Sequence, residues 1–119
     1  MTDTTASLLD FVELDELRFG QPECCGVILA DGDVMQLPNI HPEPEKGFHI
    51  DPESFLEQLQ LGAIGTWHTH PGRDPNLSEE DLVGFQAWPK LMHHIVGIRD
   101  GKPCVHSFKV LDDGVVVSA

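Results

Sequence analysis

The stretch over residues 65–81 constrains the fold of this chain more than any other part of its sequence. It reads Gly-Thr-Trp-His-Thr-His-Pro and, after a short loop, Ser-Glu-Glu-Asp, so His68 and His70 stand two residues apart. Residues i and i+2 of a β-strand point to the same face of the sheet, which would let both imidazoles reach one metal ion. The proline then ends the strand, and Ser78 begins a helix with Asp81 in its first turn. The pattern therefore predicts a strand, a loop and a helix that gather two imidazoles and a carboxylate.

Each part of this pattern also has an ordinary structural interpretation. A His-x-His pair occurs on half-buried strands without a metal, and Ser78 with an acid three residues later is a capping box that starts a helix. The two roles of Ser78 are compatible, because its oxygen can accept one hydrogen bond while its hydroxyl hydrogen serves the site. Two histidines and one carboxylate leave the fourth position of a tetrahedral zinc site open, as in catalytic zinc centres. We therefore interpret His68, His70 and Asp81 as ligands in the metal site of a hydrolase.

A second carboxylate stands at the start of another predicted strand. The apolar run over residues 24–30 is short and β-branched at its centre, which is typical of a buried strand, and Glu23 directly precedes it. Glu23 alone could be a solvated loop acid. Beside a metal, however, a carboxylate can take a proton from the attacking water and return it to the leaving group. We therefore expect Glu23 to be the general base.

Composition limits the remaining possibilities. A chain of 119 residues is expected to form one domain over residues 1–119. Seven basic residues against twenty acidic ones give a formal net charge of −13, which argues against nucleic-acid binding and suits either a basic partner or high solubility. No apolar run approaches the ~20 residues of a membrane span, and the N-terminus lacks the basic region of a signal peptide. Three cysteines, two of them adjacent, imply no disulfide framework, so we expect a reduced, cytoplasmic protein.

The chain alternates between helical and strand patterns, which predicts an α/β fold. Helices are expected over residues 6–18, 51–61 and 78–88, and strands over 24–30, 34–37, 63–70, 93–99, 103–111 and 115–118. The last helix should pack inward through Leu82, Val83, Phe85 and Trp88. Adjacent His93 and His94 should point to opposite faces, and Arg73 should be solvated unless it binds substrate. We expect a mixed, largely antiparallel sheet flanked by two or three helices, with the metal beside the helix that Ser78 begins.

These residues together resemble the JAMM (MPN-plus) metalloproteases. The pattern is Glu23, then His68-Thr-His70, seven residues, and Ser78-Glu-Glu-Asp81, with threonine at a position where serine is commoner. Pro22-Glu-Cys-Cys-Gly-Val-Ile28, Asn39, Phe48-x-Ile-Asp-Pro52, Trp88-Pro and Ile95-Val96 occur in the same order. The sequence is most similar to the prokaryotic JAB branch, in particular the peptidase domain of lambdoid phage tail-assembly proteins, over roughly residues 8–98.

The resemblance implies a JAMM/MPN (cytidine-deaminase-like) domain with a defined chemistry. It implies that His68, His70 and Asp81 bind Zn²⁺, that Glu23 is the general base and acid, and that Ser78 stabilises the oxyanion. The implied activity is hydrolysis of a peptide or isopeptide bond in a protein substrate, such as a ubiquitin-like or sulfur-carrier C-terminus or a phage tail protein. The alternative is a non-catalytic MPN-type scaffold; such modules usually lose one or more ligands, whereas this sequence has them all.

Overall fold

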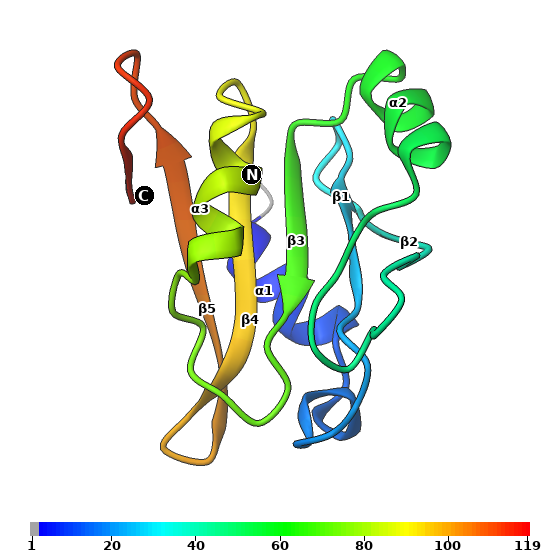
Figure 1. Ribbon diagram of the computed structural model, residues 1–119, viewed down its shortest axis with the longest axis vertical. Coiled ribbons are helices and arrows are strands. Elements are labelled where there is room, and N and C mark those ends of the chain that lie inside the picture. Colours follow the sequence, from blue (N-terminus) through cyan, green and yellow to red (C-terminus); the bar gives the residue numbers. More distant parts are fainter. Residues whose placement is uncertain (1–2) are drawn as a thin grey trace.

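Residues 3–119 are described by a computed structural model in which helices lie on both faces of one six-stranded sheet (Figure 1). The strands are β1 (Cys25–Ile28), β2 (Val34–Leu37), β3 (Gly65–Thr69), β4 (Met92–Arg99), β5 (Lys102–Val110) and β6 (Val116–Ser118). The helices are α1 (Thr4–Phe11), the 3-10 helix η1 (Leu14–Leu17), α2 (Pro52–Gln60) and α3 (Glu79–Gln86). The predicted α/β class and its mixed, largely antiparallel sheet are confirmed.

The strand order is β2-β1-β3-β4-β5-β6, and β3 and β4 form the parallel pair at its centre. Parallel neighbours need a crossover connection, which α3 supplies between the end of β3 and the start of β4. Figure 1 shows α3 in front of β4 and β5, with α1 behind the sheet. The first turn of α3 therefore returns to the end of β3 that carries the histidines.

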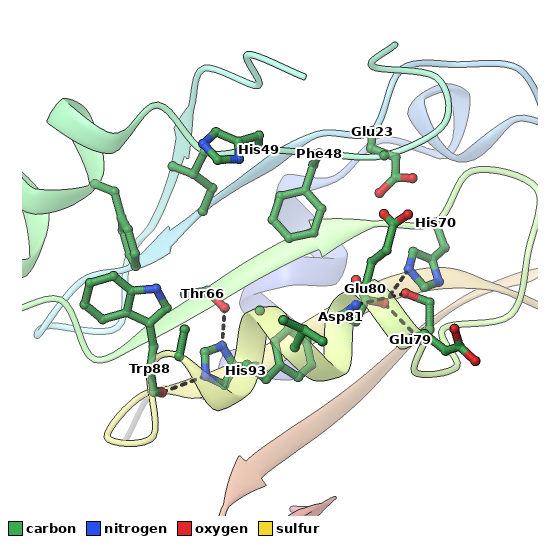
Figure 2. A pocket seen from close by; sticks show the side chains of 18 of the residues that line it. Glu23, Phe48, His49, Thr66, His70, Glu79, Glu80, Asp81, Trp88 and His93 are labelled. Carbon is green, nitrogen blue, oxygen red and sulfur yellow. Dashed lines mark hydrogen bonds and ion pairs between the residues drawn. The ribbon is translucent and has the colours of Figure 1, made fainter. Parts of the chain in front are cut away.

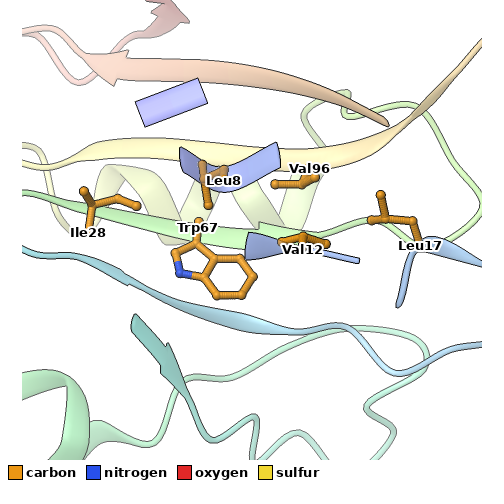
Figure 3. Close-up of a cluster of buried hydrophobic side chains, with 6 residues drawn as sticks. All are labelled: Leu8, Val12, Leu17, Ile28, Trp67 and Val96. Carbon is orange, nitrogen blue, oxygen red and sulfur yellow. The ribbon is translucent and has the colours of Figure 1, made fainter. Parts of the chain in front are cut away.

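The face of the sheet that α3 does not cover holds the larger apolar cluster. Trp67 is fully buried there against Leu8 and Val12 from the N-terminal segment and against Val96 of β4 (Figure 3). Side chains alternate between the two faces of a strand, so Trp67 on this face places His68 on the other. Burial of Trp67 thus sets the direction in which His68 points.

The opposite face carries two smaller apolar clusters. Phe55 of α2 packs with Val27 and Leu37, and Phe85 of α3 packs with Ile95 and Phe108. The histidines of β3 lie on this face, with the ring centroids of His68 and Phe85 6.0 Å apart. The helices on this face therefore build the surroundings of the candidate site.

The predicted N-terminal helix over residues 6–18 is wrong in its extent. The structure divides it into α1 and η1, because Val12 and Glu13 adopt extended backbone conformations. Asp3 caps α1 by accepting a hydrogen bond from the backbone N–H of Thr5 at 3.0 Å. The interruption turns the chain so that both Val12 and Leu17 are buried.

The predicted inward face of α3 is also partly wrong. Phe85 is 3% exposed, but Val83 is 68% exposed and Trp88 is 38% exposed. Val83 and Trp88 instead line a cleft beside α3. Within residues 3–119, the helices are too short and too polar for any of them to cross a membrane.

Candidate functional site

His68 of β3 and His70, directly after that strand, meet the carboxylate of α3. The Nε2 atoms of His68 and His70 lie 3.1 Å apart. Oδ1 of Asp81 lies 3.0 Å from Nε2 of His68, and its Oδ2 lies 3.1 Å from Nε2 of His70. All three side chains are at most 5% exposed. The three predicted ligands are thus brought together.

The start of α3 fixes the orientation of Asp81. Ser78 caps the helix by accepting a hydrogen bond on Oγ from the backbone N–H of Asp81 at 3.1 Å. In return, Oδ2 of Asp81 accepts from the backbone N–H of Ser78 at 3.2 Å. This capping box uses the Ser78 oxygen as an acceptor only, and the hydroxyl hydrogen remains available to a substrate in the same cleft.

The protonation of the site suits a cation. Nδ1 of His70 donates to the backbone carbonyl of Asp74 at 3.3 Å, so its Nε2 presents a lone pair. Burial lowers the pKa of His68 and keeps that imidazole neutral. Burial opposes the ionisation of Asp81, but the hydrogen bond from His68 and the close contact with His70 hold its pKa well below the usual range. A neutral imidazole and an ionised carboxylate are the states in which histidine and aspartate bind a metal ion.

The spacing of the three groups fits zinc. Zn–N and Zn–O bonds of about 2.0–2.1 Å in a tetrahedron place neighbouring ligand atoms about 3.3 Å apart. The observed separations of 3.0–3.1 Å are close to that value. A ring of Phe48 stacks on His68 with centroids 4.1 Å apart and covers one side of the ligand. The donor set and its geometry can therefore hold a tetrahedral ion with one open position.

Glu23 lies beside this group at the start of β1. It is 5% exposed, and one of its carboxylate oxygens lies within 4.8 Å of ligand atoms of both His68 and His70. Burial raises the pKa of Glu23, while His70 and Arg73 oppose that shift. The carboxylate of Asp81 is closer to both imidazoles than that of Glu23. The geometry therefore gives Asp81 the position of a metal ligand and makes Glu23 a neighbouring carboxylate that faces the same space.

Two residues support Glu23 through contacts that the sequence analysis did not predict. Arg73, expected to be solvated, is half-exposed and places Nη2 3.5 Å from Oε2 of Glu23. Asn39 donates from Nδ2 to the backbone carbonyl of Glu23 at 2.8 Å. Asn39 follows a proline in a loop and Arg73 lies in another loop, so neither has a periodic pattern that could have revealed these contacts.

A cleft of about 780 Å³ contains the site at one end (Figure 2). The end that holds His70 and Asp81 is polar, whereas the far end is lined by Phe55, Val83 and Trp88. His93 lies in the floor, where Nε2 donates to the backbone carbonyl of Trp88 at 3.0 Å and Nδ1 accepts from Thr66 at 2.7 Å. The cleft therefore changes from polar to apolar along its length.

Besides His93, three other histidines (His41, His49 and His94) lie outside the ligand group. His94 points to the opposite face from His93, as the alternation predicted, with Nδ1 2.7 Å from the hydroxyl of Ser107. His49 is exposed at the cleft rim, and Nδ1 of His41 accepts from a backbone N–H in its own loop. None of these three joins the ligand group.

Comparison with known proteins agrees with this geometry. The family model described as prokaryotic homologs of the JAB domain matches residues 6–110. A desampylase of Haloferax volcanii is 32% identical over 98 residues, which cover 72% of this chain and 69% of that protein. A solution structure from Desulfitobacterium hafniense has a TM-score of 0.68 and 27% identity, covering 96% of this chain and 86% of its own. Another, from Salinibacter ruber, shares the fold at a TM-score of 0.57 and 21% identity, covering 99% and 88%. The family match over most of the chain and the identity to the desampylase show that this chain belongs to the prokaryotic JAB family.

Proposed function

We propose that this chain is a zinc-dependent isopeptidase that hydrolyses an amide bond at the C-terminus of a ubiquitin-like protein modifier. The observation that carries the proposal is the cluster of two imidazoles and the Asp81 carboxylate, in contact with one another at 3.0–3.1 Å, next to the buried carboxylate of Glu23. The similarity to a desampylase, whose name denotes removal of a ubiquitin-like modifier, supports this substrate class. A phage tail protein, the other substrate considered from the sequence, has no comparable support from these relatives.

The proposed metal ligands are His68, His70 and Asp81. Zinc, when bound, supplies Lewis acidity that polarises the scissile carbonyl and makes water a stronger acid. Asp74 and Ser78 keep the ligands oriented, through the carbonyl that accepts from His70 and through the capping box around Asp81. The polypeptide thus offers the metal a preorganised site before it binds.

The proposed general base is Glu23. Burial raises its pKa, which makes it a better proton acceptor than an ordinary surface carboxylate. It takes a proton from the attacking water and delivers it to the nitrogen of the leaving amine. The hydroxyl of Ser78, free to donate, stabilises the negative charge that develops on the carbonyl oxygen. The reduced cysteines of this chain fit the cytoplasmic location we propose.

A cleavage assay tests the proposal. A ubiquitin-like protein joined through its C-terminus to a lysine side chain is incubated with zinc-loaded wild type, Glu23→Gln and Glu53→Gln. The last variant removes the same charge from an exposed position on α2. Loss of the base should lower the rate by about 10²–10⁴-fold with zinc content unchanged, and Glu53→Gln should match the wild type. Activity retained in Glu23→Gln would remove that residue from the mechanism. No cleavage by any zinc-loaded protein would favour the scaffold alternative.

A further inference from the structure

Two loops form the surface at the end of the molecule where β3 stops. The strand runs along the cleft, because Thr66 near its start and His70 after its end both line it. Beyond His70 the chain turns at Gly72, whose φ is +70° and whose N–H donates to the carbonyl of Leu17 at 2.7 Å. Figure 1 shows the loop after β3 and the segment after α1 side by side at the bottom of the molecule. The segment that follows η1 therefore borders the metal end of the cleft.

Phe19 is the exposed apolar side chain of this surface. It is 88% exposed, the highest value of any large hydrophobic side chain in residues 3–119. Its backbone is nevertheless held closely, because a Cβ atom at Gly72 would lie 2.7 Å from Cβ of Phe19 and 2.8 Å from its Cα. A single exposed apolar side chain is common on proteins, so the position of this one matters more than its exposure. Phe19 is fixed against the loop that begins two residues after His70.

Arg73, the next residue of that loop, is a cation with spare donors. Its backbone is anchored, because its carbonyl accepts from the N–H of Ile98 at 2.8 Å. Its side chain is half-exposed, and within residues 3–119 its one polar contact places Nη2 3.5 Å from Oε2 of Glu23. A guanidinium has five N–H donors in a planar fork that matches a carboxylate. Most donors of Arg73 are therefore left for an acceptor from another molecule.

The other charges that line the cleft make Arg73 the preferred place for an external carboxylate. Lys46 also lines the cleft, but it pairs with Glu43 at 3.0 Å. Glu79 and Glu80 line it as exposed acids, and the formal net charge of the chain is −13. A carboxylate from a partner is therefore repelled over most of the surface and attracted at Arg73.

The two arms of an isopeptide approach the site differently. The acyl arm is a flexible C-terminal tail that separates the folded modifier from the scissile bond. The amine arm is one lysine side chain, whose short stem joins the bond directly to the backbone of the modified protein. The surface of the modified protein must therefore lie against the enzyme close to the metal end. Phe19 and Arg73 lie there, because one packs against Gly72 and the other follows it.

We propose that Phe19 and Arg73 form the docking surface for the protein that carries the modified lysine. Arg73 pairs with a carboxylate next to that lysine, and Phe19 covers an apolar side chain beyond it. The inference rests on the proposed function for the nature of the scissile bond. It adds selectivity among modified lysines, which depends on the side chains around the lysine and not on the modifier.

A pair of branched peptides tests this docking surface without hydrolysis. In both, an acetyl-Gly-Gly arm is joined to the lysine Nε through a CH₂–NH group in place of the amide, which water cannot cleave. The lysine is the centre of capped Leu-Glu-Lys-Glu-Leu in one peptide and of Leu-Gln-Lys-Gln-Leu in the other. Each is titrated into zinc-loaded, ¹⁵N-labelled protein, where the amide of Gly72 and the Nε–H of Arg73 report binding. The indole of Trp67, buried and donating to the carbonyl of Met35 at 3.2 Å, is the internal reference.

The glutamate peptide should bind the wild type about five- to tenfold more tightly than the glutamine peptide, because its hydrogen bonds to the guanidinium are charge-assisted. Salt at about 1 M should reduce this preference. Arg73→Gln should remove it, whereas Phe19→Ala should weaken both peptides by about fivefold or more and keep it. The matched controls are Arg99→Gln and Leu14→Ala, at exposed positions that do not line the cleft, and both should bind like the wild type.

Equal affinities of the two peptides for the wild type would overturn the proposal. So would a preference that survives in Arg73→Gln, a Phe19→Ala protein that binds like Leu14→Ala, or no shift at Gly72 with about millimolar peptide. Because neither peptide can be cleaved, the outcome is separate from the cleavage assay. Selective binding by a protein that fails to cleave would contradict the proposed function and leave the docking surface intact, and cleavage without selective binding would do the reverse.

Discussion

The side chain of Asn39 makes two donated and two accepted hydrogen bonds, which hold the loop that carries Phe48 next to the start of β1. Its Nδ2 donates to the backbone carbonyls of Glu23 at 2.8 Å and Gly47 at 3.1 Å. Its Oδ1 accepts from the backbone N–H groups of His41 at 3.0 Å and His49 at 2.9 Å. The segment it fastens carries Phe48, whose ring stacks on His68. One side chain therefore connects the candidate base to the cover of the metal site.

Asn39→Asp removes both donors and keeps the size and both acceptors. Each neutral hydrogen bond contributes about 1 kcal/mol net, so the change should cost about 2 kcal/mol of unfolding free energy, with repulsion between carboxylate and carbonyls adding to it. For 119 residues, the unfolding entropy is about 250 cal/mol/K, so Tm should fall by about 8 °C. Because the carbonyl of Glu23 loses its donor, cleavage should slow by about tenfold or more.

Thermal unfolding and cleavage are measured for Asn39→Asp beside Asn76→Asp. The control adds the same charge at an exposed position, where the side-chain oxygen of Asn76 accepts from Arg99 at 3.4 Å and an aspartate can do the same. Asn76→Asp should change Tm by less than about 2 °C, and both variants should keep zinc. Equal Tm values for the two variants would refute the role assigned to Asn39.

Two further predictions concern the sheet beneath the site. Burial lowers the pKa of His94 from 6.5 to about 4, so the unfolded chain binds more protons between those values and stability falls as pH falls. From pH 7 to pH 5 the wild type should lose about 2 kcal/mol more than His94→Gln in urea unfolding, and parallel pH profiles would contradict this. Gly97→Ala would place a methyl group against the carbonyl of Arg73 and 2.8 Å from the nitrogen of Pro75. It should cost about 1–3 kcal/mol and weaken zinc binding through the Asp74 carbonyl, whereas Gly84→Ala, with open space around it, should not destabilise the fold; calorimetry and zinc titration of both variants check this.

The meeting of His68, His70 and Asp81 could be predicted from the sequence, because it depends on local periodicity. The two-residue spacing of His68 and His70 sets their common face, and the capping pattern of Ser78 sets the place of Asp81 in the first helical turn. These rules apply within one strand or one helix. The direction of that face then follows from the burial of Trp67. The side chain of Trp67 points to the opposite face of the strand and packs against the N-terminal helix.

What the sequence did not reveal depends on contacts between distant segments. Hydrophobic spacing predicted an inward Val83, but the cleft beside α3 leaves it exposed. The same spacing predicted one N-terminal helix, and the break at Val12 appears only because both flanking segments must reach the same cluster. Arg73 approaches Glu23 across fifty positions of sequence, and Asn39 links loops that carry no periodic pattern.

Metal content of the purified protein tests the central claim most directly. Plasma mass spectrometry is applied to the wild type, Asp81→Ala and Glu79→Ala after exposure to zinc and removal of the excess. Glu79 is an exposed acid in the same helical turn, so its variant controls for charge. The wild type and Glu79→Ala should each retain about one zinc per chain, and Asp81→Ala should lose it, because two imidazoles alone bind weakly. A wild type without zinc, or a folded Asp81→Ala with full zinc, would contradict the site described here.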